Sequence, residues 1–121
     1  MAPKILVIDD DPLVLRSVEN VLKREKYSYE LATNAEEAIQ KSSIETFDLV
    51  ISDIRMPGTN GVETVRAIRK IFDTKIKKDI PIIFITGYAD LGDQLKAEDL
   101  GEVILKPFDL NQLLMTIREY L

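Results

Sequence analysis

The chain has 121 residues, 45% of them hydrophobic and 31% charged, and its net charge at pH 7 is −5. This size predicts one domain with a single core over residues 1–121, and no apolar run is long enough for a membrane span. The absence of cysteine excludes disulfides and thiolate chemistry and suits a cytoplasmic protein, and the absence of histidine removes the commonest general base. The acidic balance argues against direct nucleic-acid binding, and we interpret the basic cluster at residues 75–78 as a solvated loop.

Short apolar runs alternate with amphipathic stretches along the chain. The runs predict five strands, which we place at residues 4–8, 27–33, 47–53, 80–86 and 102–106. Three of the helices have a capping residue at their start, namely Asp11, Asn34 and Asp109, and another helix is expected to start near Asn60-Gly61. The remaining helix, residues 91–100, has a poor apolar stripe, and a polar linker is expected at residues 73–79. The alternation predicts an α/β, flavodoxin-like (βα)5 domain with a doubly wound five-stranded parallel sheet in the order 2-1-3-4-5.

Polar residues end four of these strands. They are Asp9 and Asp10 after the first strand, Asp53 at the third, Thr86 at the fourth and Lys106 at the fifth. With strands one and three adjacent, three carboxylates meet at the carboxyl edge of the sheet, where open α/β sheets bind ligands. Carboxylates that close repel one another unless a cation is present, and Mg²⁺ prefers oxygen ligands. A carboxylate beside Mg²⁺, a lysine and a hydroxyl is equipped to accept a phosphoryl group as an aspartyl phosphate.

Each of these residues also has a purely structural interpretation. Asp53 alone is equally well explained as a turn or cap residue, and Asp11 fully so. Thr86 alone is more often a satisfied strand-end hydroxyl, and Lys106 before Pro107 can be a surface lysine. The placement of polar groups at four strand ends together is what favours a site.

The residues resemble the receiver domain of two-component response regulators, and the match runs along the whole chain. The motifs that carry it are Ile5-Leu6-Val7-Ile8-Asp9-Asp10-Asp11, Asp48-Leu49-Val50-Ile51-Ser52-Asp53-Ile54-Arg55-Met56-Pro57-Gly58, Asn60-Gly61, Ile85-Thr86-Gly87 and Leu105-Lys106-Pro107-Phe108.

The resemblance implies roles for the site residues. It makes Asp53 the phosphoacceptor, with Asp10 and Asp53 as direct Mg²⁺ ligands, Asp9 as a ligand through water and the backbone carbonyl of Arg55 as a further ligand. It places Thr86 and Lys106 on the phosphoryl group and suggests a cis peptide at Lys106-Pro107. The resemblance also implies that the phosphoryl donor is a histidine kinase or histidine phosphotransfer protein, and that the domain catalyses only its own phosphorylation and dephosphorylation. An effector domain or a homodimer as the output is left open.

The chain departs from the family pattern in a few places. Val103 stands where receivers commonly carry the tyrosine or phenylalanine that moves with the threonine hydroxyl. The segment between Thr86 and Lys106 is shorter than usual, and the segment before residue 80 is longer. Arg55 and Tyr88 lie at positions that tune dephosphorylation in the family.

Two other functions are consistent with parts of the pattern. A phosphatase similar to the haloacid dehalogenases would use Asp9 as nucleophile and Asp11 as acid, although Pro12 and Leu13 fit that motif poorly. A receiver fold retained only as a binding module would keep the residues without being phosphorylated. The sequence does not identify the kinase, the pathway or the output.

Overall fold

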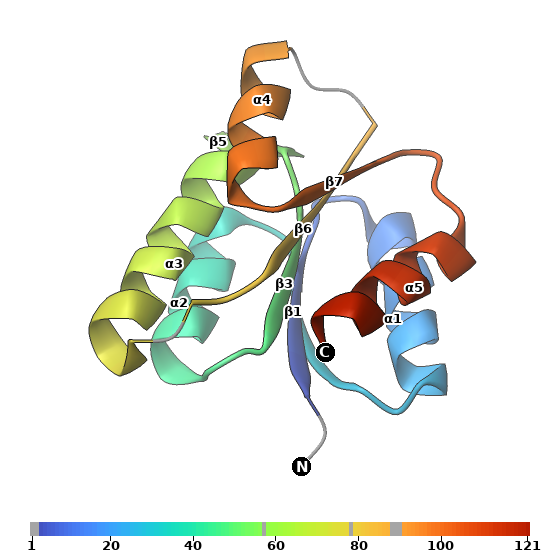
Figure 1. Ribbon diagram of the computed structural model, residues 1–121, viewed down its shortest axis with the longest axis horizontal. Helices are drawn as coiled ribbons and strands as arrows, with labels where there is room; N and C mark the ends of the chain where they lie inside the picture. The colour runs from blue at the N-terminus through green and yellow to red at the C-terminus, as the bar shows by residue number, and fades with distance from the viewer. Residues whose placement is uncertain (1–2, 57, 78, 88–90) are drawn as a thin grey trace.

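The computed structural model describes residues 3–56, 58–77, 79–87 and 91–121. Its main sheet has five parallel strands in the order β2-β1-β3-β6-β7, which confirms the predicted order (Figure 1). The strands are β1 (Lys4–Ile8), β2 (Ser28–Ala32), β3 (Leu49–Asp53), β6 (Ile82–Thr86) and β7 (Glu102–Leu105). Every residue of β3 and β6 is buried, as expected for central strands of a parallel sheet covered on both faces.

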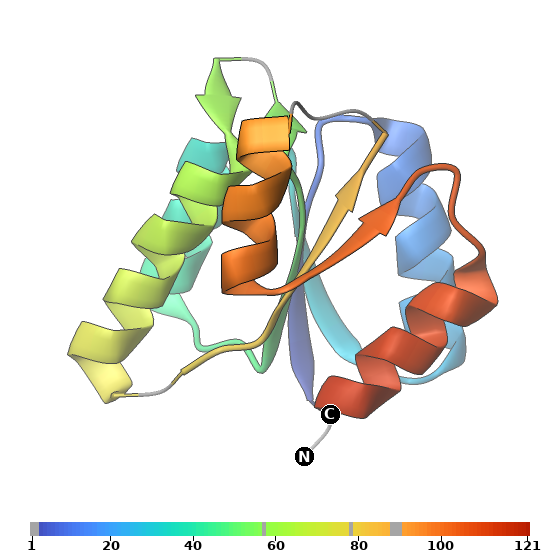
Figure 2. The same cartoon turned by 45° about the horizontal axis from the view of Figure 1, so that its top comes forward.

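A short antiparallel ribbon follows β3 and was not expected from the sequence. It pairs β4 (Arg55–Met56) with β5 (Thr59–Asn60), at the same end of the molecule as the carboxyl ends of β1 and β6 (Figure 2). The sequence signals only a turn here, because a strand of two residues is too short to produce an apolar period.

Five helices cover the sheet. α1 (Pro12–Arg24) and α5 (Leu110–Tyr120) lie on one face, and α2 (Ala35–Ile44), α3 (Gly61–Ile76) and α4 (Leu91–Leu100) lie on the other (Figure 1). The three predicted caps are confirmed, and the structure adds Asn60 as the cap of α3. A side-chain oxygen of each of these residues accepts a first-turn N–H at 2.7–2.9 Å; the residues are Asp11, Asn34, Asn60 and Asp109. No helix in the described part of the chain has the length and apolar character needed to span a membrane.

The third helix is longer than predicted. We expected a linker from residue 73, but α3 continues to Ile76 and ends where Lys77 takes a left-handed conformation, with φ of 51°. No glycine or proline lies between residues 62 and 76, so nothing in the sequence terminates the helix earlier. The interpretation of residues 75–78 as a loop is therefore wrong for Lys75 and Ile76.

The strands divide the core into two layers. In β1, Leu6 and Ile8 face α2 and α3, whereas Ile5 and Val7 face α1 and α5. This alternation fixes the register of β1 against its neighbours, because a slip of one residue would exchange the two faces. It also fixes which strand ends meet at the carboxyl edge.

Candidate functional site

Three carboxylates meet where β1 and β3 end. The two strands pair in parallel with Ile8 opposite Ser52, so Asp9 and Asp53 follow at the same edge of the sheet. Asp9 is 2% exposed and Asp53 7% exposed, while Asp10 is open to solvent. One carboxylate oxygen from each of the three lies within 4.8 Å of the other two. The predicted convergence of the three aspartates is therefore seen in the structure.

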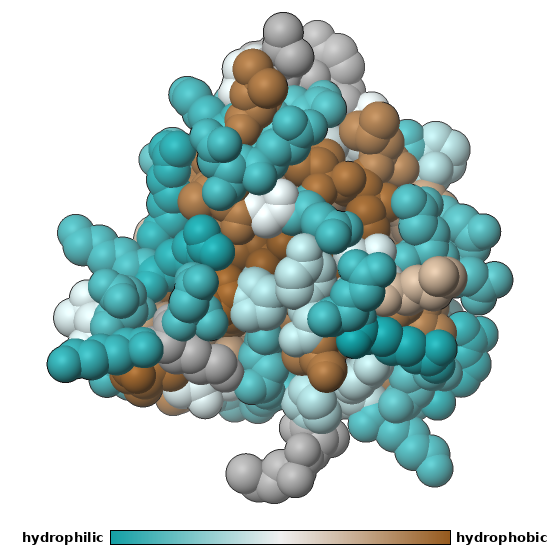
Figure 3. All heavy atoms as spheres, viewed as in Figure 1, coloured by the Kyte–Doolittle hydropathy of each residue, from teal (hydrophilic) through white to brown (hydrophobic). Residues whose placement is uncertain are grey.

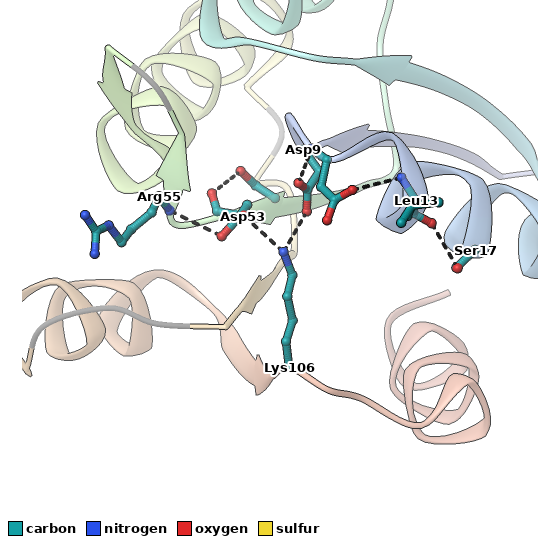
Figure 4. Close-up of polar contacts among 8 residues, drawn as sticks. Asp9, Leu13, Ser17, Asp53, Arg55 and Lys106 are labelled. Carbon is teal, nitrogen blue, oxygen red and sulfur yellow. Dashed lines mark hydrogen bonds and ion pairs between the residues drawn. The ribbon is translucent and has the colours of Figure 1, made fainter.

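Lys106 reaches this cluster from the end of β7. Its Nζ lies 3.1 Å from Oδ2 of Asp9 and 3.1 Å from Oδ2 of Asp53, so one ammonium bridges both buried carboxylates (Figure 4). Its backbone N–H donates to the carbonyl of Thr86 at 2.8 Å, which ties it to the adjacent strand end. The Lys106-Pro107 peptide is cis, as the sequence resemblance suggests.

Burial and neighbouring charges have opposing effects on the pKa values of Asp9 and Lys106. Burial raises the pKa of the Asp9 carboxyl, and repulsion from Asp53 raises it further. The hydrogen bond from the Asp11 N–H and the positive charge of Lys106 lower it, but the net effect is a raised pKa. Burial alone would lower the pKa of Lys106, but Asp9 and Asp53 together outweigh it and raise that pKa. The lysine therefore stays protonated, while the cluster still holds more negative than positive charge.

The backbone around Asp53 is held by its neighbours. The Arg55 N–H donates to Oδ1 of Asp53 at 3.2 Å, and the buried Ser52 hydroxyl donates to the Asp53 carbonyl at 2.9 Å. Gly61 packs so close that a Cβ there would lie 1.8 Å from the same carbonyl oxygen, and its N–H donates to Ile54 at 2.6 Å. Sequence reasoning placed Gly61 in a motif and gave Ser52 no role, because neither contact leaves a pattern in the sequence.

The other predicted site residues lie around the cluster. Thr86 is fully buried at the end of β6, the strand that pairs with β3 so that Asp53 lies opposite Ile85. The Arg55 side chain is exposed and points away from the carboxylates, so only its backbone belongs to the site (Figure 4). Val103 lies opposite Phe84 in the sheet and packs against the α2–α3 core layer. Tyr88 lies outside the described residues.

The donor set fits a hard divalent cation. Among the described residues the cluster consists of three carboxylates, without a histidine or cysteine ligand, and Mg²⁺ prefers a small number of carboxylates together with retained waters. Asp11 belongs to a different structure, because its exposed carboxylate accepts the Leu13 N–H at 2.9 Å and caps α1. That contact gives no support to Asp11 as the acid of a phosphatase.

Comparison with known proteins agrees with this geometry. The family model described as the response regulator receiver domain matches residues 5–118. The chain belongs to this family. A CheY-like receiver domain protein from Methanospirillum hungatei superposes with a TM-score of 0.85 at 31% identity, covering 98% of this chain and 93% of that one. Vibrio cholerae chemotaxis protein CheY4 superposes with a TM-score of 0.86 at 29% identity and covers all of both chains.

Among curated relatives, the receiver domain is 34% identical over 120 residues to the transcriptional regulatory protein ResD of Bacillus subtilis. It is 33% identical over 120 residues to the response regulator ArlR of Staphylococcus saprophyticus. These alignments cover 98% of this chain but only 48% and 52% of the relatives, so the chain spans about half the length of the curated relatives it matches. It is a receiver domain of two-component signalling, a signalling domain rather than an enzyme with its own substrate.

Proposed function

We propose that Asp53 accepts a phosphoryl group from a phosphohistidine. A carboxylate oxygen of Asp53 attacks phosphorus, the P–N bond breaks, and the imidazole leaves with the electron pair of that bond. The observation that carries the proposal is the shared ammonium of Lys106, 3.1 Å from both Asp53 and Asp9. The same ammonium is within reach of an oxygen on a phosphoryl group held by Asp53, where it would balance part of the added charge.

We further propose that Mg²⁺ is the cofactor. Asp10 and Asp53 would hold it directly, Asp9 through water, and Arg55 through its backbone carbonyl. When bound, the cation supplies positive charge that neutralises the phosphoryl oxygens and relieves the repulsion among the carboxylates. The protein's own contribution is to hold Asp53 rigidly, through Ser52, Gly61 and the Arg55 N–H, and to keep Lys106 protonated.

The reverse reaction belongs to the same site. Hydrolysis of the aspartyl phosphate by water would release inorganic phosphate and restore the Asp53 carboxylate, so the domain would catalyse only its own phosphorylation and dephosphorylation. Phosphorylation adds charge and acceptor oxygens next to the buried Thr86, whose hydroxyl would follow them and shift the protein-interaction surface.

The donor histidine must lie on another chain or segment, since residues 1–121 contain none. An apolar groove of about 380 Å³ lies beside Lys106, between the start of α1 and the β7–α5 connection. Leu13 is 70% exposed at its edge, and Phe108 and Leu110 line the opposite side. We propose that this groove receives the helix of the histidine kinase or histidine phosphotransfer protein that carries the phosphohistidine.

We propose that residues 1–121 form one receiver domain that acts in the cytoplasm. The domain would act through protein partners, such as an effector domain or a second copy in a homodimer, and not by direct contact with nucleic acid or membrane. The net charge of −5 supports this choice, because a surface for nucleic acid or anionic lipid needs a positive balance.

The test is covalent labelling with acetyl phosphate and, separately, binding of beryllofluoride, each with and without Mg²⁺. We expect Mg²⁺-dependent labelling of the wild type, complete loss in Asp53→Asn, and full retention in the matched control Asp73→Asn, whose carboxylate is exposed on α3. Mapping the modified residue by mass spectrometry then decides the chemistry. A label on Asp9 would replace this proposal with a phosphatase mechanism, and an unlabelled wild type would indicate a binding module.

A further inference from the structure

The C-terminal half of α3 carries a groove that the phosphoryl chemistry does not use. The groove has a volume of about 460 Å³ and is lined by Ala67, Lys70, Ile71, Thr74 and Lys75, which we call the α3 groove. Its residues are spaced three or four apart, so they form one stripe along the helix. Lys75 reaches across to α2, where its Nζ donates to the Ser43 carbonyl at 2.7 Å. The stripe therefore lies on the side of α3 that faces α2.

The α3 groove is positively charged in a protein that is acidic overall. Six of the 16 Lys and Arg residues lie between residues 66 and 78, against a single acidic residue, Asp73. Arg66 is paired with Glu63 at 2.9 Å, and Arg69 approaches Asp79 at 3.5 Å. Within the described part of the chain, neither Lys70 nor Lys75 has a carboxylate partner. A groove with an apolar floor between two such lysines is suited to bind a partner surface that presents a hydrophobic side chain flanked by carboxylates.

The outer face of α4 has the opposite character. Leu95 is 53% exposed, while Ala97, on the other side of the helix, is fully buried. Glu98 and Asp99 follow Leu95 by three and four residues, so both carboxylates flank it on one face. We call Leu95, Glu98 and Asp99 the α4 outer face. Hydrophobic atoms do break the hydrophilic surface over α4 and β7 in the space-filling view (Figure 3).

These two surfaces cannot meet within one molecule. The α3 groove lies toward α2, and the C-terminal end of α3 projects away from α4 in both views (Figures 1 and 2). They complement each other between molecules, since one offers a hydrophobic side chain with two carboxylates and the other an apolar groove with two lysines. A flat lipid surface would not fill a groove of this size, and the chain's own net charge opposes anionic membranes.

We propose that this receiver domain associates head to tail with further copies of itself, the α4 outer face of one copy docking in the α3 groove of the next. The contact joins two different surfaces, so it does not close on a dimer and the assembly grows with protein concentration. One helix in one groove is a small interface, which implies a dissociation constant on the order of 0.1–1 mM. The contact is electrostatic at its edges.

The test is analytical ultracentrifugation of the 121-residue chain over a concentration series, in about 50 mM and about 500 mM NaCl, since salt screens exposed charges. One variant reverses the charge of the α3 groove (Lys70→Glu with Lys75→Glu), and another reverses the charge of the α4 outer face (Glu98→Lys with Asp99→Lys). We expect the wild type to grow in mass with concentration at low salt, and each reversed variant alone to stay monomeric. An equimolar mixture of the two variants regains association, because the unchanged acidic α4 face of the first variant meets the unchanged basic groove of the second, and the reversed groove meets the reversed α4 face.

Matched controls exclude a simple effect of net charge. The pair Arg16→Glu with Lys23→Glu on α1, and the pair Glu36→Lys with Glu119→Lys, make the same charge changes elsewhere on exposed positions. Each control variant should associate with itself as the wild type does, because both docking surfaces are unchanged. Leu95→Ala should weaken association about tenfold, whereas Leu105→Ala on β7, also exposed, should leave it unchanged.

Several results would overturn the proposal. A wild type that stays monomeric at about 1 mM in low salt does so directly. Association of either charge-reversed variant with itself would also contradict the proposal. Association lost in Leu105→Ala but kept in Leu95→Ala would place the contact over β7 instead. Labelling of Asp53 by acetyl phosphate in every variant shows that each is folded, and it separates failure of this contact from failure of the phosphoryl chemistry.

Discussion

Lys106 follows β7 and contacts Asp53 at the end of β3 across the intervening strand β6, with its Nζ 3.1 Å from Oδ2 of the carboxylate. The same ammonium lies 3.1 Å from Asp9, so it is the positive charge that the described residues place against both buried carboxylates. Its side chain is only 20% exposed, which means that solvent screens the interaction weakly. Lys106 therefore contributes to the stability of the metal-free protein, and it is also the residue that we propose to contact the phosphoryl group.

Replacing this lysine should be costly without metal. Lys106→Met leaves two buried carboxylates unbalanced, and we expect the free energy of unfolding in EDTA to fall by about 1–3 kcal/mol. The matched control is Lys23→Met, which removes an exposed pair to Glu19 at 4.0 Å and should change stability by less than about 0.5 kcal/mol. Urea denaturation measures both. Equal losses in the two variants would mean that the carboxylates do not depend on Lys106.

Neutralising Asp9 should have the opposite sign. Because the folded protein raises the pKa of Asp9 above its ordinary value of 3.8, the folded state binds this proton more readily than the unfolded state. The resulting penalty is absent below pH 3.8 and grows as the pH rises through the raised folded-state pKa. Asp9→Asn lacks the penalty, and its Oδ1 still accepts the Asp11 N–H, a bond of 2.9 Å in the wild type.

We therefore expect Asp9→Asn to be more stable than the wild type in EDTA at pH 7. The advantage should shrink toward zero as the pH falls to the ordinary aspartate value. Denaturation curves of both proteins over this pH range give the difference in their free energies of unfolding. Contributions from titratable groups that both proteins share cancel in this difference. An advantage that is constant with pH would show that the effect is not the charge of Asp9.

The sequence predicted the strand order and the meeting of Asp9, Asp10, Asp53 and Lys106, because both follow from short-range signals. Apolar runs mark buried strands, and polar residues that directly follow them must lie at the same edge of a parallel sheet. The caps were equally readable, since Asp11 and the other capping residues act on N–H groups two or three positions away.

Two features of the structure were not predicted, and each has a physical reason. The close packing of Gly61 against the Asp53 carbonyl is a tertiary contact across a turn, and the sequence does not show whether a Cβ would fit at residue 61. The continuation of α3 to Ile76 was missed because residues 73–77, apart from Ile76, are polar and follow the last buried residue of the helix, Phe72. That continuation is what creates the basic end of the helix.

Magnesium should stabilise the folded protein through Asp10. A cation that binds only the folded state adds about 2.7 kcal/mol to the free energy of unfolding when its free concentration is about 100 times its dissociation constant. Asp10→Asn removes the exposed carboxylate that we propose as a ligand and should lose most of this gain. Asp11→Asn is the matched control, because asparagine also caps helices well and the Asp11 carboxylate is used by the Leu13 N–H.

Thermal unfolding with increasing MgCl₂ measures both responses. We expect the midpoint to rise for the wild type and for Asp11→Asn, and to rise much less for Asp10→Asn. CaCl₂ at the same ionic strength controls for screening, since Ca²⁺ prefers more oxygen ligands than this cluster offers. Equal responses of the two variants would place the cation somewhere other than the three aspartates.

Gly61 should control the position of Asp53. The Cβ of an alanine at residue 61 would lie 1.8 Å from the Asp53 carbonyl oxygen and 3.0 Å from the Ile54 Cα, so the backbone must move. We expect Gly61→Ala to lose about 3 kcal/mol of stability. Gly87→Ala is the matched control on the other side of the site, because its Cβ would meet only Lys106 side-chain atoms at 3.6 Å, an ordinary contact.

The two glycine variants should also differ in acetyl phosphate labelling, measured per folded molecule at a temperature where both are folded. Gly61→Ala should label at least about tenfold more slowly, because the displaced carbonyl shifts the carboxylate relative to Lys106. Gly87→Ala should label within about twofold of the wild type, since an ordinary van der Waals contact displaces nothing. If Gly61→Ala loses stability but labels at the wild-type rate, the close packing supports only the fold, and the carboxylate is positioned by Ser52 and the Arg55 N–H alone.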